Sequence, residues 1–142
     1  MSKKGYLIDT DIIIDYFKAK YKLNDKIKSV GLDNCYVSEI TIAELLFGAL
    51  KSNDKERHEK NIDRLKSRVQ VIPISKVLSR YSKERLRLER MGKRLPDFDL
   101  LIAVTAVEYD LTLVTGNVKH HSRVKGVEVE NWREKVHNEF IE

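Results

Sequence analysis

Residues 5–17 read GYLIDTDIIIDYF, in which a short apolar run passes directly into an amphipathic pattern. The run up to Ile8 predicts a β-strand that ends at Asp9. After Asp9 the apolar residues recur three to four positions apart as far as Phe17, which predicts a helix. A carboxylate therefore stands where a strand is followed by a helix, and parallel sheets bind their ligands beyond the carboxyl ends of such strands.

The same pattern recurs along the chain. A polar connection containing Gly31 and Asn34 follows the first helix. Apolar runs predict further strands at residues 36–38, 69–72, 111–115 and, at a sheet edge, 126–129. Periodicity and turn residues predict helices that start at Thr41, span 54–67, run from an N-cap at Ser75 to near Gly92, and start at Pro96. This alternation indicates a single α/β domain over residues 1–142, with an open, mostly parallel sheet of four to five strands covered by helices.

Composition narrows the classes of protein that fit. At 142 residues the chain is long enough for one core, and its longest apolar run, Leu100 to Val107, is too short to cross a bilayer. The N-terminus lacks the pattern of an export signal, so we expect a cytoplasmic protein with no membrane partner. The single cysteine, Cys35, excludes an internal disulfide and is expected to be buried. The formal net charge of +5 favours an anionic partner such as nucleic acid.

Three separated acids, Asp9, Glu44 and Asp99, fall where predicted strands end or helices begin. In a parallel sheet these positions meet at one edge. Crowded carboxylates raise one another's pKa, so such a site is stable at neutral pH mainly with a cation among them. Oxygen ligands without cysteine favour Mg²⁺ or Mn²⁺. Neutral oxygens are expected nearby from Thr10, Thr115 and Asn117.

Each acid also has an ordinary structural explanation. Thr41 and Glu44 match a capping box, in which Glu44 would reach back to the Thr41 backbone. Asp97 or Asp99 would serve equally as a helix cap. Asp11 and Asp15 lie near a helix start, where the helix dipole favours negative charge, and Asp11 is also a candidate for supporting the site.

At these residues the chain resembles the PIN-domain ribonucleases, and among them the VapC-type toxins. The resemblance rests on four segments in the family's order, LIDTDIIIDYF (7–17), ITIAELLFGA (40–49), LPDFDLLIAVTAVEYDLTLVT (95–115) and GNVKHHSRVKGVEVENW (116–132). It implies a three-layer α/β/α sandwich and an endoribonuclease in which Asp9, Glu44 and Asp99 hold Mg²⁺ or Mn²⁺, with Asp97 as the alternative third acid. It also implies RNA as substrate, a cognate antitoxin protein as partner, and a homodimer.

The chain departs from the family at one position. Many relatives carry a fourth acid after the fourth strand, whereas this chain has Asn117, followed by His120 and His121. Asn117 brings an oxygen but no charge, which puts a second metal in doubt. Contact with RNA or action near the site is one interpretation of the two histidines, and we prefer the other, that they are surface loop residues without a catalytic role.

Basic residues on the helix before Gly92 recur at three-to-four spacing, at Arg80, Lys83, Arg87, Arg90 and Arg94. A stripe of this kind is typical of a solvated helix face. We favour that interpretation slightly over the alternative, in which the stripe guides RNA toward the acids through Arg87, Arg90 and Arg94.

Two alternatives remain open from the residues alone. Asp9-Thr-Asp11 after an apolar strand also resembles the start of a haloacid-dehalogenase-like phosphatase, with Asp9 as nucleophile, although no late paired-aspartate loop follows. The other alternative is a noncatalytic RNA-binding module with the same fold.

Overall fold

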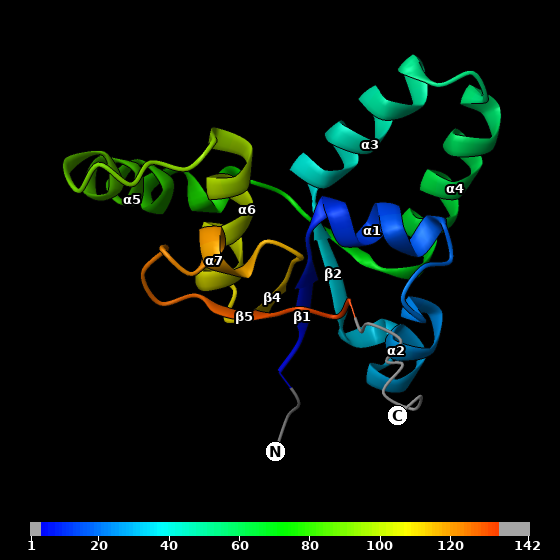
Figure 1. Ribbon diagram of the computed structural model, residues 1–142, viewed down its shortest axis with the longest axis horizontal. Helices are drawn as coiled ribbons and strands as arrows, with labels where there is room; N and C mark the ends of the chain where they lie inside the picture. Colours follow the sequence, from blue (N-terminus) through cyan, green and yellow to red (C-terminus); the bar gives the residue numbers. More distant parts are fainter. Residues whose placement is uncertain (1–3, 134–142) are drawn as a thin grey trace, which may run out of the picture.

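Five parallel strands form the central layer of the computed structural model, which describes residues 4–133 (Figure 1). The strands are β1 (Tyr6–Ile8), β2 (Cys35–Ser38), β3 (Gln70–Ile72), β4 (Thr112–Val114) and β5 (Glu128–Glu130). Their order across the sheet is β3-β2-β1-β4-β5, and every neighbouring pair is parallel. The prediction of a mostly parallel sheet of four to five strands is confirmed.

Helices cover both faces of this sheet. They are α1 (Thr10–Phe17), α2 (Leu23–Val30), α3 (Glu39–Lys51), α4 (Lys55–Arg68), α5 (Leu78–Arg90), α6 (Asp97–Glu108) and α7 (Val118–His121). Successive side chains of a strand point to opposite faces, so on β1 Ile8 joins the core under α1 to α4, whereas Leu7 joins the core under α5 and α6. Figure 1 shows the two groups of helices on opposite sides of the strands. The three-layer α/β/α sandwich is confirmed.

Helix α6 is the most deeply buried helix of the second core. It begins at Asp97 after Pro96, as predicted, and its apolar residues are buried on nearly every side. It has only 12 residues. Within residues 4–133, no helix combines the length and apolar character that a membrane span requires.

Four local predictions were wrong. Helix α3 begins at Glu39 and is capped by Ser38, whose side chain accepts from the Ile40 N–H at 3.0 Å, so Thr41 lies inside the helix and forms no capping box. Ser75 does not cap α5 but opens a 3₁₀ turn, Ser75–Val77. Helix α2 was missed because LNDKIKSV buries only Leu23 and Ile27. Helix α7 was missed because four residues carry no periodicity.

The strand order places a topological switch point at β1. The chain leaves β1 toward β2 and β3 on one side and returns to β4 and β5 on the other. Ligands of open α/β sheets bind in the crevice that such a reversal creates beyond the carboxyl ends of the strands. The residues that directly follow β1 and β4 are Asp9 and Thr115, so these two side chains mark the expected site.

Candidate active site at the carboxyl ends of β1 and β4

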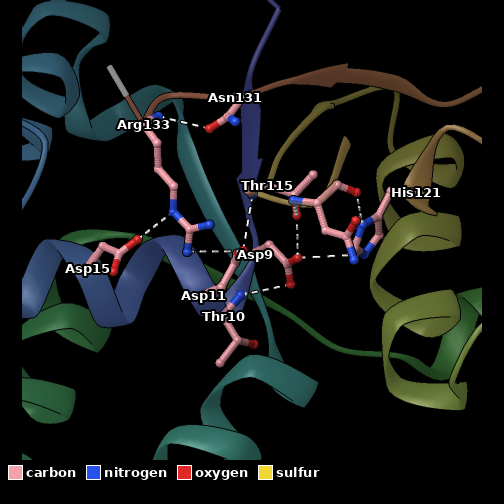
Figure 2. A network of polar contacts seen from close by, with 10 residues as sticks. Asp9, Thr10, Asp11, Asp15, Thr115, His121, Asn131 and Arg133 are labelled. Atoms are coloured by element: carbon pink, nitrogen blue, oxygen red, sulfur yellow. Dashed lines mark hydrogen bonds and ion pairs between the residues drawn. The ribbon is translucent and has the colours of Figure 1, made fainter. Parts of the chain in front are cut away.

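Asp9 lies at the centre of this crevice with only 5% of its surface exposed. Its backbone is extended and places the residue at the N-cap of α1. One carboxylate oxygen, Oδ1, accepts from the Thr10 N–H at 2.8 Å, and the other, Oδ2, accepts from the Thr115 hydroxyl at 2.8 Å (Figure 2). Both oxygens are therefore held in fixed directions by residues at the ends of adjacent parallel strands.

Burial makes the ionised form of Asp9 costly. Loss of hydration, and after it the nearby charge of Asp11, raise its pKa, and the net effect takes it from 3.8 to about 6. His121 and the hydrogen bonds from Thr115 and Thr10 act in the opposite direction. The carboxylate is thus ionised at neutral pH but poorly stabilised by the protein, which is the condition under which a bound cation gains most.

Glu44 is joined to the Asp9 segment through Thr10. The Thr10 hydroxyl lies 2.6 Å from Glu44 Oε1 and 2.9 Å from Thr41 Oγ1. A hydroxyl carries one proton, and an ionised carboxylate only accepts, so Thr10 donates to Glu44 and accepts from Thr41. This bridge ties α1 to α3 beside the site. It also excludes the structural explanation of Glu44 as part of a capping box.

The third acid sits in the first turn of α6. Asp99 is half-buried there, and α6 packs against both α3 and α7. Asp97, two residues earlier, is exposed and already accepts from the Tyr81 hydroxyl at 2.9 Å and from Arg94 at 3.2 Å. These contacts hold the pKa of Asp97 below its usual value. They favour Asp99 over Asp97 as the third acid.

A complete metal cage is absent from the part of the chain that is described. In residues 4–133, no three His, Cys, Asp or Glu side chains are grouped closely enough to hold an ion. The meeting of Asp9, Glu44 and Asp99 around one cation therefore stays a prediction. Mg²⁺ keeps several waters and uses one or two carboxylates, so a site that begins from Asp9 and Glu44 suits its chemistry.

The segment after β4 completes the support of Asp9. Thr115 is fully buried and, besides donating to Asp9, accepts from the Asn117 N–H at 3.1 Å. Asn117 thus contributes through its backbone, and its carbonyl oxygen lies 2.9 Å from His121 Nδ1. The Asn117 side chain is exposed, so its contribution of an oxygen to a metal stays a prediction.

His121 contradicts the interpretation of both histidines as surface loop residues. It is 2% exposed, because the missed helix α7 turns its ring toward Asp9 (Figure 2). Its Nε2 lies 3.6 Å from Asp9 Oδ2 and has no hydrogen-bond partner among the described residues. His120 is half-buried and has no such contact with Asp9 in that part of the chain.

An arginine that the sequence pattern did not identify organises the second half of the polar network. Arg133 donates through Nε to Asp15 Oδ2 at 2.6 Å, and its Nη2 lies 3.4 Å from Asp11 Oδ2 (Figure 2). The Gly116 N–H also donates to Asp11, at 3.1 Å. A Cβ at Gly116 would overlap the Arg133 guanidinium, so only glycine permits this approach. Asp11 and Asp15 therefore have a structural role as partners of Arg133. Their position near a helix start indicated a structural role but not this partner.

Replacing Arg133 with Ala is expected to lower the free energy of unfolding by about 1–3 kcal/mol, because it leaves the Asp15 carboxylate, 11% exposed, without its partner. The matched control is Arg57→Ala. Its pair with Asp54 lies on the surface, where solvent screens the charges, so a clearly smaller loss is expected. Urea denaturation at neutral pH measures both. Equal losses in the two variants would contradict a structural role for Arg133.

The predicted RNA-contact arginines are largely engaged within the protein. Arg87 donates to Glu84 and to the Arg123 carbonyl oxygen, and Arg94 pairs with Asp97. Arg90 is exposed and forms no ion pair within residues 4–133. Contact of these residues with RNA stays a prediction, and Arg90 is the one most free to make it.

Comparison with known proteins agrees with this architecture. The model of the PIN domain family matches residues 6–127. Ribonuclease VapC2 of Rickettsia felis is 33% identical over 135 residues, which cover 89% of this chain and 97% of that protein. The solved structure of VapBC2 from Rickettsia felis, bound to a promoter DNA fragment, is 32% identical with a TM-score of 0.83, covering 89% and 98%. A toxin–antitoxin complex from Klebsiella pneumoniae is 26% identical with a TM-score of 0.67, covering 92% and 100%. The chain therefore belongs to the PIN domain family.

Proposed function

We propose that the chain is a metal-dependent endoribonuclease and the toxin of a toxin–antitoxin pair, with Asp9, Glu44 and Asp99 as the residues that hold Mg²⁺ or Mn²⁺. The observation that carries this proposal is the buried Asp9 carboxylate, held at the switch point of the sheet by Thr10 and Thr115. The similarity to a protein named ribonuclease VapC2 over almost the whole chain supports the choice of RNA.

The donors present fit a hard divalent cation. Asp9 presents a carboxylate whose pKa is raised by burial, and Asp11 adds a second negative charge close by. Asp11 Oδ1 is buried with no hydrogen-bond partner within the described residues. An excess of buried oxygen acceptors of this kind is stabilised by a cation that they share, directly or through its waters.

In the proposed reaction the residues of the chain hold the cation and the RNA in place, and the bonds that change belong to the RNA and to water. When bound, a divalent cation makes its water easier to deprotonate and offsets charge on the phosphodiester. Thr115 and Thr10 leave the carboxylates of Asp9 and Glu44 little freedom to turn. These two carboxylates would therefore hold the cation in a fixed direction relative to the substrate. Water adds its oxygen to phosphorus and loses a proton, one phosphorus–ester oxygen bond breaks, and the departing oxygen takes up a proton from solvent to leave as a hydroxyl group. Burial of Asp9 excludes bulk water and strengthens its attraction for the cation.

The test is cleavage of unstructured RNA by purified protein in Mg²⁺, in Mn²⁺ and in excess EDTA. Cleavage with either metal and its loss in EDTA are expected. Absence of cleavage in all three conditions, with folded protein, would support the noncatalytic RNA-binding module instead. The phosphatase alternative finds no support in the contacts, because Asp11, which would have to act as the acid, is bound to Gly116 and Arg133.

Replacing Thr10 with Val is expected to reduce cleavage by about 10- to 100-fold, the usual effect of losing a partner that orients a metal-binding residue. The change removes the hydroxyl that Glu44 accepts from and keeps the side-chain shape. The matched control is Thr105→Val, a buried threonine whose hydroxyl donates, within residues 4–133, only to the Leu101 carbonyl oxygen of its own helix. Initial rates of RNA cleavage at saturating metal measure both. A Thr10→Val protein as active as the Thr105→Val protein would contradict the role of the bridge.

We also propose that the cognate antitoxin lays a segment into a groove next to the site. The groove is about 270 Å³ and is lined by apolar residues of α1, α3 and α4 together with Glu44, namely Ile14, Phe17, Leu45, Ala49 and Ile62. Lys18 and Arg57 also line it, so an amphipathic segment with acidic flanks is complementary. The similarity to a solved toxin–antitoxin complex supports this kind of occupant. The homodimer implied by the resemblance stays a prediction.

Replacing Gly48 with Leu is expected to block the groove and spare the enzyme. A Cβ at Gly48 meets nothing within 4 Å, and leucine favours the helix over glycine by about 0.8 kcal/mol. RNA cleavage should stay unchanged, while inhibition by the antitoxin, sought as the product of a small reading frame beside the gene, should weaken at least about tenfold. Gly48→Ala is the control for the helix effect. Full inhibition of Gly48→Leu would place the antitoxin elsewhere.

A further inference from the structure

The His121 ring has one nitrogen whose partner is clear and one whose partner is missing. His121 is the last residue of α7, and its Nδ1 lies 2.9 Å from the Asn117 carbonyl oxygen. A carbonyl oxygen can only accept, so Nδ1 carries the hydrogen and the neutral ring leaves a lone pair on Nε2. That nitrogen is buried, with no hydrogen-bond partner within the described residues. Its lone pair can bind a cation or accept a hydrogen bond, and no described residue supplies either.

His121 Nε2 faces the Asp9 carboxylate (Figure 2). Nε2 lies 3.6 Å from Asp9 Oδ2, which is too long for a hydrogen bond. The separation is shorter than twice a metal–ligand bond of roughly 2.1 Å, so one ion can reach both atoms. Oδ2 is also the oxygen that Thr115 orients. The His121 ring and the Asp9 carboxylate therefore face each other in the buried interior (Figure 2).

The surroundings of His121 match those of a metal-binding histidine. Such residues almost always donate the hydrogen of the other ring nitrogen to a carbonyl or a carboxylate, which fixes the ring and raises the basicity of the ligating nitrogen. The Asn117 carbonyl oxygen has this relation to His121. It is a backbone group of the same short helix turn, so the ring orientation is set locally and without a substrate.

We propose that His121 Nε2 is a direct ligand, together with Asp9, of the divalent cation, and that it makes the site selective for a first-row transition metal such as Mn²⁺ over Mg²⁺. The selectivity follows from ligand chemistry. Imidazole nitrogen suits transition metals, whereas Mg²⁺ is bound by oxygen and releases its waters reluctantly. This inference rests on the proposed function, since it concerns the same metal.

The test measures metal binding directly on the full chain without an affinity tag. Mn²⁺ binding is followed by electron paramagnetic resonance, and Mg²⁺ binding by competition with Mn²⁺. The pulsed spectrum of bound Mn²⁺ should show coupling to a coordinated nitrogen. In His121→Asn the amide can still donate to the Asn117 carbonyl oxygen but no atom replaces Nε2. This variant should lose the coupling and bind Mn²⁺ about 10- to 100-fold more weakly, while its Mg²⁺ affinity changes by about threefold or less.

The neighbouring variant His120→Asn is the matched control and should keep both the nitrogen coupling and the Mn²⁺ affinity. If His121→Asn fails to fold, His121→Gln, which keeps a longer polar side chain, is expected to lose the coupling in the same way. Bound Mn²⁺ without nitrogen coupling in the unmodified protein would overturn the role of His121 and leave the proposed nuclease intact. Failure of both Mn²⁺ and Mg²⁺ to bind would overturn the role of His121 and the metal-dependent function together.

Discussion

Replacing Asp9 with Asn is expected to lower the rate of RNA cleavage by on the order of 10³-fold or more. A bound cation stabilises the transition state by several kcal/mol, and each loss of about 1.4 kcal/mol lowers the rate tenfold. Asparagine keeps the size of the side chain and an oxygen for Thr115 but removes the charge that holds the cation. Asp9 is the residue of choice because both of its oxygens are already oriented by the protein. Single-turnover cleavage at saturating Mg²⁺ and at saturating Mn²⁺ measures the loss.

Two variants in the first turn of α6 complete this experiment. Asp99→Asn is expected to resemble Asp9→Asn, since Asp99 is half-buried and α6 packs beside α3 and α7. Asp97→Asn is the matched control and should stay within about threefold of the parent, because its carboxylate is bound to Tyr81 and Arg94 rather than turned to a ligand. An Asp9→Asn protein that cuts RNA at the parent rate would refute the assignment of the site. Inactivity of Asp97→Asn would transfer the third role to Asp97.

The sheet was predictable because its signals are local. Each strand is an apolar run next to a helical pattern, and parallel connections admit few topologies. Asp9 could be identified for the same reason, since it directly follows an apolar strand. Helix α2 was not predicted because its eight residues are mostly polar and only Leu23 and Ile27 are buried. A helix this short is stabilised by tertiary packing, which the sequence pattern does not show.

The contacts of the site were less predictable because they join distant positions. The bridge from Thr10 to Glu44 spans 34 residues, and the pair of Arg133 with Asp15 spans 118. Hydrophobic periodicity predicts contacts within a helix or strand and does not predict pairs so far apart in the sequence. Thr41 illustrates the difficulty, since its spacing to Glu44 matches a capping box while the folded chain uses Ser38 as the cap. The burial of His121 beside Asp9 depends on α7, and four residues are too few for a helix to be predicted from periodicity.

Asp9→Asn is also expected to stabilise the metal-free protein at neutral pH while it abolishes activity. The pKa of Asp9 is about 6 in the folded state, above the ordinary value of 3.8 that applies to the unfolded chain. Between these values the folded protein binds more protons than the unfolded chain, so ionised Asp9 costs stability as pH rises from about 4 to about 6. Above pH 6 the cost is constant and at most about 3 kcal/mol, from about 1.4 kcal/mol per unit of pKa.

Asparagine avoids this cost, so in EDTA at pH 7 the variant should exceed the parent in free energy of unfolding by on the order of 1–3 kcal/mol. The difference should shrink as pH falls from about 6 to about 4 and vanish only below about pH 3, where Asp9 is protonated in both states. Other titrating groups are common to both proteins and cancel in the comparison. Urea denaturation at intervals from pH 3 to pH 7 measures the difference.

Metal should reverse the order of stability. A cation present at about 1,000 times its dissociation constant adds about 4.1 kcal/mol to the parent, which exceeds the gap in EDTA, and it should add little to the variant. The opposite pH dependence, with the parent more stable than the variant in EDTA and the gap widening from pH 4 to pH 6, would mean that Asp9 already has a cationic partner within the fold. His121, 3.6 Å away, is the group that would supply that charge. A carboxylate so paired would gain little from a metal, and both the cation and the ligand role of His121 would lose their physical basis.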